Sequence, residues 1–99
     1  MSSLLSLPLF AQKQITEIRV RDSEKESVIE SATLQWRALG SSLYMDGTTT
    51  DRKGIARVNA DVGQKLVLSV SYVGYQTATD TITSDGKRYT IKLYPDAMA

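Results

Sequence analysis

The feature that most constrains this chain is a two-residue alternation of apolar and polar side chains, which begins near residue 14. Ile18 and Val20 flank Arg19, and the same pattern recurs at 32–38, 56–60, 66–72 and 89–93. Successive side chains of a β-strand point to opposite faces, so this period is typical of strands with one buried face. The pattern predicts an all-β fold.

Clusters of Gly, Asp and Ser separate the alternating segments, as at Asp46-Gly47 and Asp61-Val62-Gly63. Such residues favour turns, and turns every 8–12 residues are typical of a β-sandwich. We expect about seven strands in two packed sheets, near 14–21, 28–38, 43–50, 54–60, 65–73, 76–83 and 87–94. The polar stretch Arg21–Ser31 is expected to be a surface loop, because no apolar residue recurs there at helical spacing.

The N-terminus carries a short apolar run, Leu4 to Phe10, that ends at Ala11. Because a bilayer-spanning helix needs about 20 apolar residues, this run is too short to cross a membrane. It resembles the end of a secretory signal peptide cleaved after Ala11. We therefore expect residues 1–11 to be a signal-peptide remnant and 12–99 to be one exported domain; a first strand or a disordered tail are the alternatives.

Two residue types are missing: the chain has neither histidine nor cysteine. This excludes disulfides, thiolate nucleophiles, Ser-His-Asp catalysis and zinc sites built on these ligands. Twelve basic residues against eleven acidic ones give a formal charge of +1. The basic residues form no run, so we expect no nucleic-acid partner.

The segment Ser71-Tyr72-Val73-Gly74-Tyr75-Gln76-Thr77 is the most informative one. A glycine within a strand pattern marks a bulge or bend, and the two flanking tyrosines can then bury on different faces. The segment closely resembles the S-Y-x-G-Y-x-T hallmark of the carboxypeptidase-regulatory-like domain. That family is best known as the N-terminal extension of the SusC/RagA class of TonB-dependent outer-membrane receptors.

Other segments extend the resemblance over about residues 14–96. Gly47-Thr48-Thr49-Thr50-Asp51-Arg52-Lys53-Gly54 is similar to the family's G-T-x-T-D-x-x-G turn, and weaker matches lie at 31–34, 63–67 and 91–96. Glu30-Ser31 replaces the family's usual Pro-Gly pair, and the loop 39–45 is longer than the family norm. Ala56 stands where Phe or Tyr is common, so we expect Trp36 to fill that part of the core.

The resemblance implies a prealbumin/transthyretin-like (immunoglobulin-like) Greek-key sandwich in the periplasm or outer membrane of a Gram-negative cell. It implies a protein partner in the outer-membrane uptake machinery, with a glycan as a possible ligand, and a domain that does not itself span the membrane. It implies no cofactor. Transthyretin-like hydrolases share the architecture but depend on histidines, which this chain lacks, so no enzyme is expected.

Carboxylates and tyrosines are the remaining candidates for chemistry. Asp46 with Asp51, and Asp80 with Asp85, are pairs that acid–base catalysis can use, but eleven scattered acids produce such pairs by chance. The 46–51 segment lacks the ligand alternation of a calcium loop, and Thr48–Thr50 is more typical of a strand. We therefore assign no catalytic, cofactor-binding or metal-binding residue.

Five tyrosines are numerous for so short a chain and raise the alternative of a sugar-binding platform. Alternation places Tyr72 and Tyr89 inward with the core, whereas Tyr44 and Tyr94 are expected to be exposed. Tyr75 begins the run after the hallmark glycine. Packing in the core or at its rim is the favoured role for this set.

Three functions follow. The first is a non-catalytic accessory domain in the cell envelope, the N-terminal periplasmic domain of, or related to, a TonB-dependent nutrient or glycan receptor. The alternatives are a free-standing secreted interaction or adhesion module, and a regulatory domain of a peptidase. Strand addition at an exposed sheet edge is one way for such a domain to bind, but the sequence does not identify the free edge.

Overall fold

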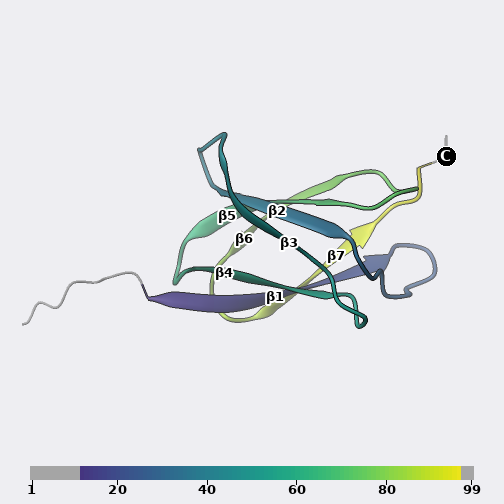
Figure 1. The fold of residues 1–99 in the computed structure, drawn as a ribbon, viewed down its shortest axis with the longest axis horizontal. Coiled ribbons are helices and arrows are strands. Elements are labelled where there is room, and N and C mark those ends of the chain that lie inside the picture. The colour runs from purple at the N-terminus through teal and green to yellow at the C-terminus, as the bar shows by residue number, and fades with distance from the viewer. Residues whose placement is uncertain (1–11, 97–99) are drawn as a thin grey trace, which may run out of the picture.

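The fold is all-β, as predicted: the computed structural model describes residues 12–96, and within that range it contains seven strands and no helix (Figure 1). The predicted signal-peptide remnant, 1–11, lies outside the described residues. The strands are β1 (Lys13–Asp22), β2 (Thr33–Ala38), β3 (Tyr44–Thr49), β4 (Ile55–Asp61), β5 (Lys65–Ser71), β6 (Ala78–Thr83) and β7 (Arg88–Leu93).

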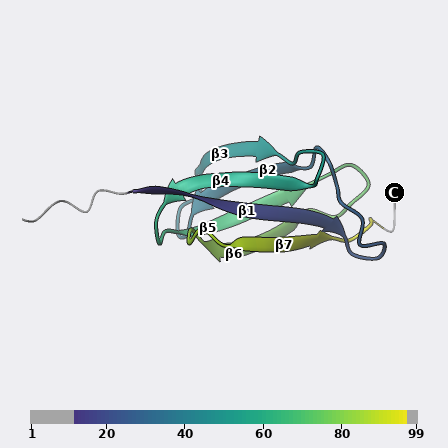
Figure 2. The same ribbon diagram turned by 90° about the horizontal axis from the view of Figure 1, so that it is seen from below.

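The strands form a two-layer sandwich of the prealbumin-like type, which confirms the predicted fold class. One sheet has three strands in the order β4-β1-β7, and the other has four in the order β3-β2-β5-β6 (Figure 2). β1 pairs antiparallel with β4 and parallel with β7, whereas every pair in the four-stranded sheet is antiparallel. β3 lies beside β4 along one side of the sandwich, and β6 beside β7 along the other.

The core lies between the two sheets and follows the alternation seen in the sequence. Its fully buried side chains come from the inward positions of both sheets and include Ile18, Val20, Leu34, Val58, Leu66, Leu68, Val70 and Leu93. Burying one such side chain contributes about 1.5–3 kcal/mol. Trp36 is buried in the same cluster as the small Ala56, in line with its expected role as a core filler.

Three strand boundaries differ from the prediction by two or more residues. The strand expected from 28 begins at Thr33, because Ser31 adopts a φ of 67° that interrupts the extended backbone. Val28 forms only an isolated bridge to Arg21, within the expected surface loop. The strand expected to reach 73 ends at Ser71, and the next begins at Ala78 instead of 76. The hallmark segment is therefore the connection between β5 and β6.

Candidate functional site

The hallmark segment is a turn that is anchored at several points. Gly74 adopts a φ of 89°, a conformation that costs glycine little, and the Tyr75 N–H donates to the Tyr72 carbonyl at 3.1 Å. The prediction that Tyr72 faces the core is wrong: β5 has ended, and this side chain is 36% exposed. The two tyrosines contact each other instead of burying on different faces, with ring centroids 6.0 Å apart and planes tilted by 44°.

The Tyr75 hydroxyl reaches a carboxylate at the end of β1. It donates to Asp22 Oδ2 at 2.6 Å, while Asp22 Oδ1 accepts the N–H groups of Glu24 and Lys25 at 2.7 and 2.8 Å. These hydrogen bonds lower the pKa of Asp22, and the bond from Tyr75 contributes most. The Tyr75–Asp22 bond also raises the pKa of Tyr75. Asp22 is only 2% exposed. No local sequence pattern indicates its role, because its tyrosine partner lies 53 residues away.

The second family-like segment also has a structural role. Asp51 Oδ1 accepts the Ile55 and Lys53 N–H groups at 3.0 and 2.8 Å. These two hydrogen bonds lower the pKa of Asp51, and the bond from Ile55 contributes most. Gly54 has a φ of 73°, and a Cβ atom there would lie 3.0 Å from the Val20 carbonyl oxygen. Only glycine fits this turn without displacing β1.

The four carboxylates considered for acid–base chemistry are each bonded to nearby backbone. Asp46 accepts the Gly47 N–H and Asp80 the Thr81 N–H, at 2.8 and 2.9 Å. Asp85 accepts the Tyr89 hydroxyl at 2.6 Å and the Lys87 N–H at 2.9 Å, and these bonds, that of Tyr89 first, lower the pKa of Asp85. The bond from Tyr89 also raises the pKa of that tyrosine. Across residues 12–96 no three potential metal-ligating side chains are grouped to hold an ion.

The tyrosines do not form one platform. Tyr44 and Tyr94 are exposed as predicted, at 49% and 59%, but Tyr44 begins β3 at one end of the sandwich and Tyr94 follows β7 at the other. Tyr89 is half-buried and packs against the core, also as predicted. A ring contact within the described residues joins only Tyr72 and Tyr75.

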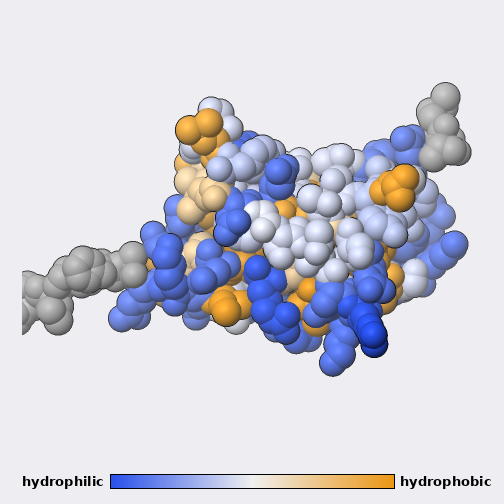
Figure 3. Space-filling view, viewed as in Figure 1, coloured by the Kyte–Doolittle hydropathy of each residue, from blue (hydrophilic) through white to orange (hydrophobic). Residues whose placement is uncertain are grey.

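An apolar tip projects from the sandwich where β2 turns into β3. We use this name for four exposed side chains: Leu39, Leu43, Tyr44 and Met45. Figure 3 shows the projection as a hydrophobic patch at the upper left of the molecule. The tip is an exposed apolar surface of the kind that often marks an interaction site.

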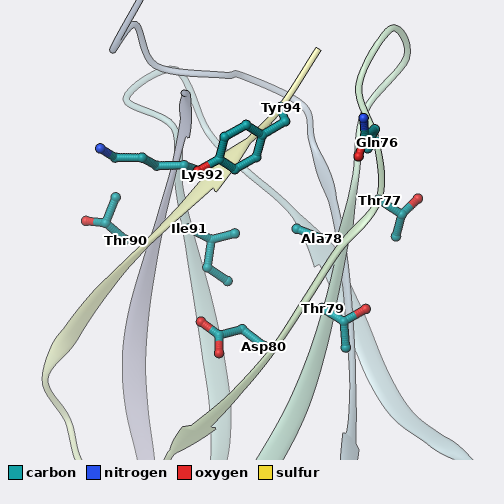
Figure 4. A pocket seen from close by; sticks show the side chains of 9 residues that line it. All are labelled: Gln76, Thr77, Ala78, Thr79, Asp80, Thr90, Ile91, Lys92 and Tyr94. Atoms are coloured by element: carbon teal, nitrogen blue, oxygen red, sulfur yellow. The ribbon is translucent and has the colours of Figure 1, made fainter. Parts of the chain in front are cut away.

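A cleft of about 370 Å³ lies between β6 and β7, where the edges of the two sheets separate. Its lining comes from Gln76–Asp80, from Thr90–Lys92 and from Tyr94. In Figure 4, Ile91, Ala78 and Asp80 point into the gap, whereas Thr90 and Lys92 point away from it. Accordingly, Thr90 Oγ1 accepts hydrogen bonds from Nε and Nη2 of Arg19, both at 3.3 Å, on the outer face of the three-stranded sheet. The cleft therefore combines an apolar floor with one inward carboxylate.

At one end of the cleft the Gln76 N–H donates to the Tyr94 carbonyl at 2.9 Å. From there the lining extends along β6 to Asp80 and along β7 to Thr90. The long side between the two strands is open. This geometry suits an extended chain that approaches from the side.

Comparison with known proteins shows the fold but no family. No family model matches the sequence, and no curated protein matches it. Among solved structures, the chain resembles the shaft pilin SpaA from Lactobacillus rhamnosus GG with a TM-score of 0.72 at 15% identity, over 89% of this chain and 48% of the pilin chain. The C-terminal domain of SpaA, solved alone, gives a TM-score of 0.71 at 16% identity, over 86% and 99% of the two chains. The chain thus spans about half the length of the shaft pilin chain in that structure.

An enzyme shares the same fold. 3-Chlorocatechol 1,2-dioxygenase from Rhodococcus opacus 1CP matches with a TM-score of 0.70 at 12% identity, over 87% of this chain and 60% of the enzyme. Identities this low establish the sandwich architecture alone, because one fold serves many functions. Pilin domains and an enzyme are both built on it. Within residues 12–96 no helix is long and apolar enough to cross a membrane.

Proposed function

We propose that this chain is a non-catalytic interaction domain of the cell envelope, the N-terminal periplasmic domain of, or related to, a TonB-dependent nutrient or glycan receptor. One observation carries the proposal: the two family-like segments, far apart in sequence, attach to the same end of β1. Val20 N–H donates to the Gly54 carbonyl at 2.8 Å, and Asp22 accepts the Tyr75 hydroxyl. The two segments thus bond to β1 within two residues of each other, and this shared anchoring point supports a family relationship.

The domain acts by binding and positioning, without making or breaking bonds. Its candidate carboxylates serve as acceptors for nearby backbone N–H groups. The partner is a protein of the outer-membrane uptake machinery, and a glycan is the second candidate ligand. The chain is exported, and residues 1–11 are its signal-peptide remnant.

A free-standing secreted interaction or adhesion module is the second candidate, and the apolar tip favours it. Leu43 is the most exposed side chain of the tip, at 76%. An exposed apolar projection of this kind suits a module that docks by itself. A regulatory domain of a peptidase is the third candidate.

Fractionation of native cells distinguishes these functions. An antibody against residues 12–96 is used on cytoplasmic, periplasmic and outer-membrane fractions, with the size of each band measured against the 10.9 kDa chain. The proposal predicts a far larger band in the outer-membrane fraction. A band near 10.9 kDa in the periplasm or medium would favour the free-standing module, and a cytoplasmic band would overturn both.

A further inference from the structure

The sandwich is one strand short on the side of the cleft. The four-stranded sheet ends in β6, but the facing sheet has only three strands and ends in β7. No strand of the described chain occupies the place beside β7 that would cover β6. The cleft lies at this place, lined on one side by β6 and on the other by β7.

The free edge of β7 carries backbone groups that a new strand can bind. Glu17 N–H donates to the Lys87 carbonyl, and Ser23 N–H to the Leu93 carbonyl, so the odd-numbered residues of β7 bond to β1. In a parallel ladder the intervening residues turn their N–H and C=O groups the other way. The groups of Arg88, Thr90 and Lys92 therefore point to the open side.

The inner face of β6 is the surface that an added strand would cover. Ala78 and Ile82 on this face pack against the core, but Asp80, which alternates with them, is exposed within the cleft. An inward charge on an edge strand discourages pairing with an apolar strand, because covering it would bury an uncompensated carboxylate. The same charge favours a strand that presents a cation at that point.

We propose that the cleft accepts an extended segment of a partner protein as an additional strand beside β7, with a Lys or Arg side chain turned toward Asp80. The inference rests on the proposed function as an interaction domain and names the chemistry of its partner. β7 is six residues long, so the bound segment covers about 20 Å with small or apolar side chains facing Ile91 and Ala78. Backbone bonds supply the binding energy, and Asp80 supplies the selectivity.

A tethered peptide tests this directly. The sequence Thr-Val-Thr-Lys-Thr-Val-Thr is fused after Ala99 of the full chain through a Gly/Ser linker of about ten residues, which has a root-mean-square span of roughly 17 Å and raises the effective concentration to about the millimolar range. A matched fusion carries Glu in place of Lys. Amide hydrogen exchange is then followed by NMR for each residue of β6 and β7.

The Lys fusion should slow exchange at Thr90 and Lys92 by about tenfold or more relative to the Glu fusion, while Ile91, already bonded to β1, stays unchanged. The variant Asp80→Lys should reverse the preference between the fusions. Asp46→Lys, on the edge strand β3 at the other side of the sheet, should leave it as it is.

Slower amide exchange at Thr79 and Thr81, rather than at Thr90 and Lys92, would overturn the proposal. The backbone groups of Thr79 and Thr81 lie on the free edge of β6, so their protection would mean that the added strand extends the four-stranded sheet. Equal exchange in both fusions would overturn it as well. Neither result bears on the envelope location, which fractionation tests separately. A domain outside the envelope that still took up the Lys strand would refute the receptor proposal alone.

Discussion

Thr50 holds the loop before β2 in place, a role that its position in a threonine triplet does not indicate. Its Oγ1 donates to the Ile29 carbonyl at 2.7 Å and accepts the Ala32 N–H at 2.9 Å, and the residue is 3% exposed. A buried donor and a buried acceptor are thus both satisfied by one hydroxyl. Thr49, its neighbour, is exposed on β3.

Replacing this hydroxyl by a methyl group should leave both buried partners unbonded. We expect Thr50→Val to lower the free energy of unfolding by about 1–3 kcal/mol, measured by urea denaturation. Thr49→Val changes an exposed strand residue in the same way and should alter stability by less than about 0.5 kcal/mol. Equal effects of the two substitutions would show that the Thr50 bonds contribute nothing.

The Tyr75–Asp22 bond should make stability depend on pH at both extremes. The folded-state pKa of Asp22 lies below its usual 3.8, so its contribution is full above that value and is lost as the pH falls through the lowered pKa. The pKa of Tyr75 lies above its usual 10.0, so its contribution is full below that value and is lost as the pH rises through the raised pKa. Thermal unfolding midpoints between pH 2 and 11 measure both losses.

Asp22→Asn should reduce the acid and the alkaline losses, because the amide can still accept the Glu24 and Lys25 N–H groups but does not titrate. The losses that Asp51, Asp85 and Tyr89 contribute should remain. The matched variant Asp46→Asn, on exposed β3, should keep the acid and alkaline losses of the parent chain. An Asp22→Asn profile that follows the parent's at both extremes would contradict the assigned roles.

At the scale of the strands, the sequence was sufficient to predict those features that depend on residues close together in the chain. Alternation located five of the seven strands, since side-chain direction follows from position along the chain, and the turn residues between the alternating segments placed β3 and β6. It failed at Tyr72, where the continued period hid the turn that ends β5 at Ser71. The sequence did not predict the role of Asp22, because this role depends on a contact 53 residues away. It did not predict the cleft either, because the cleft depends on the order of strands in two sheets.

The free edge of β7 leads to a prediction about the unbound chain. Amide exchange should alternate along this strand: slow at Tyr89, Ile91 and Leu93, which bond to β1, and fast at Arg88, Thr90 and Lys92. Hydrogen exchange followed by NMR measures each position. The central strand β1, paired on both sides, should be protected throughout Glu17–Arg19 and is the internal control. Uniform slow exchange along β7 would mean that its edge is already covered.

At the scale of the whole molecule, two surfaces are available for a partner, and they lie apart. The apolar tip is at the end where β2 turns into β3, and the cleft runs along the side formed by β6 and β7, toward the end that carries Tyr94. The cleft combines the unpaired backbone of β7 with an apolar floor and the inward carboxylate of Asp80. For this reason we place partner binding at the cleft.

Photo-crosslinking in native cells tests that placement most directly. Photoreactive benzoylphenylalanine replaces Tyr94, which lines the cleft, or Tyr44, which belongs to the tip; both side chains are exposed aromatics. After irradiation, we expect a covalent adduct with an envelope protein from the Tyr94 position. This adduct should be lost when Asp80→Lys is added, and no adduct should form from Tyr44. An adduct from Tyr44 alone, or one formed only with cytoplasmic proteins, would contradict this placement.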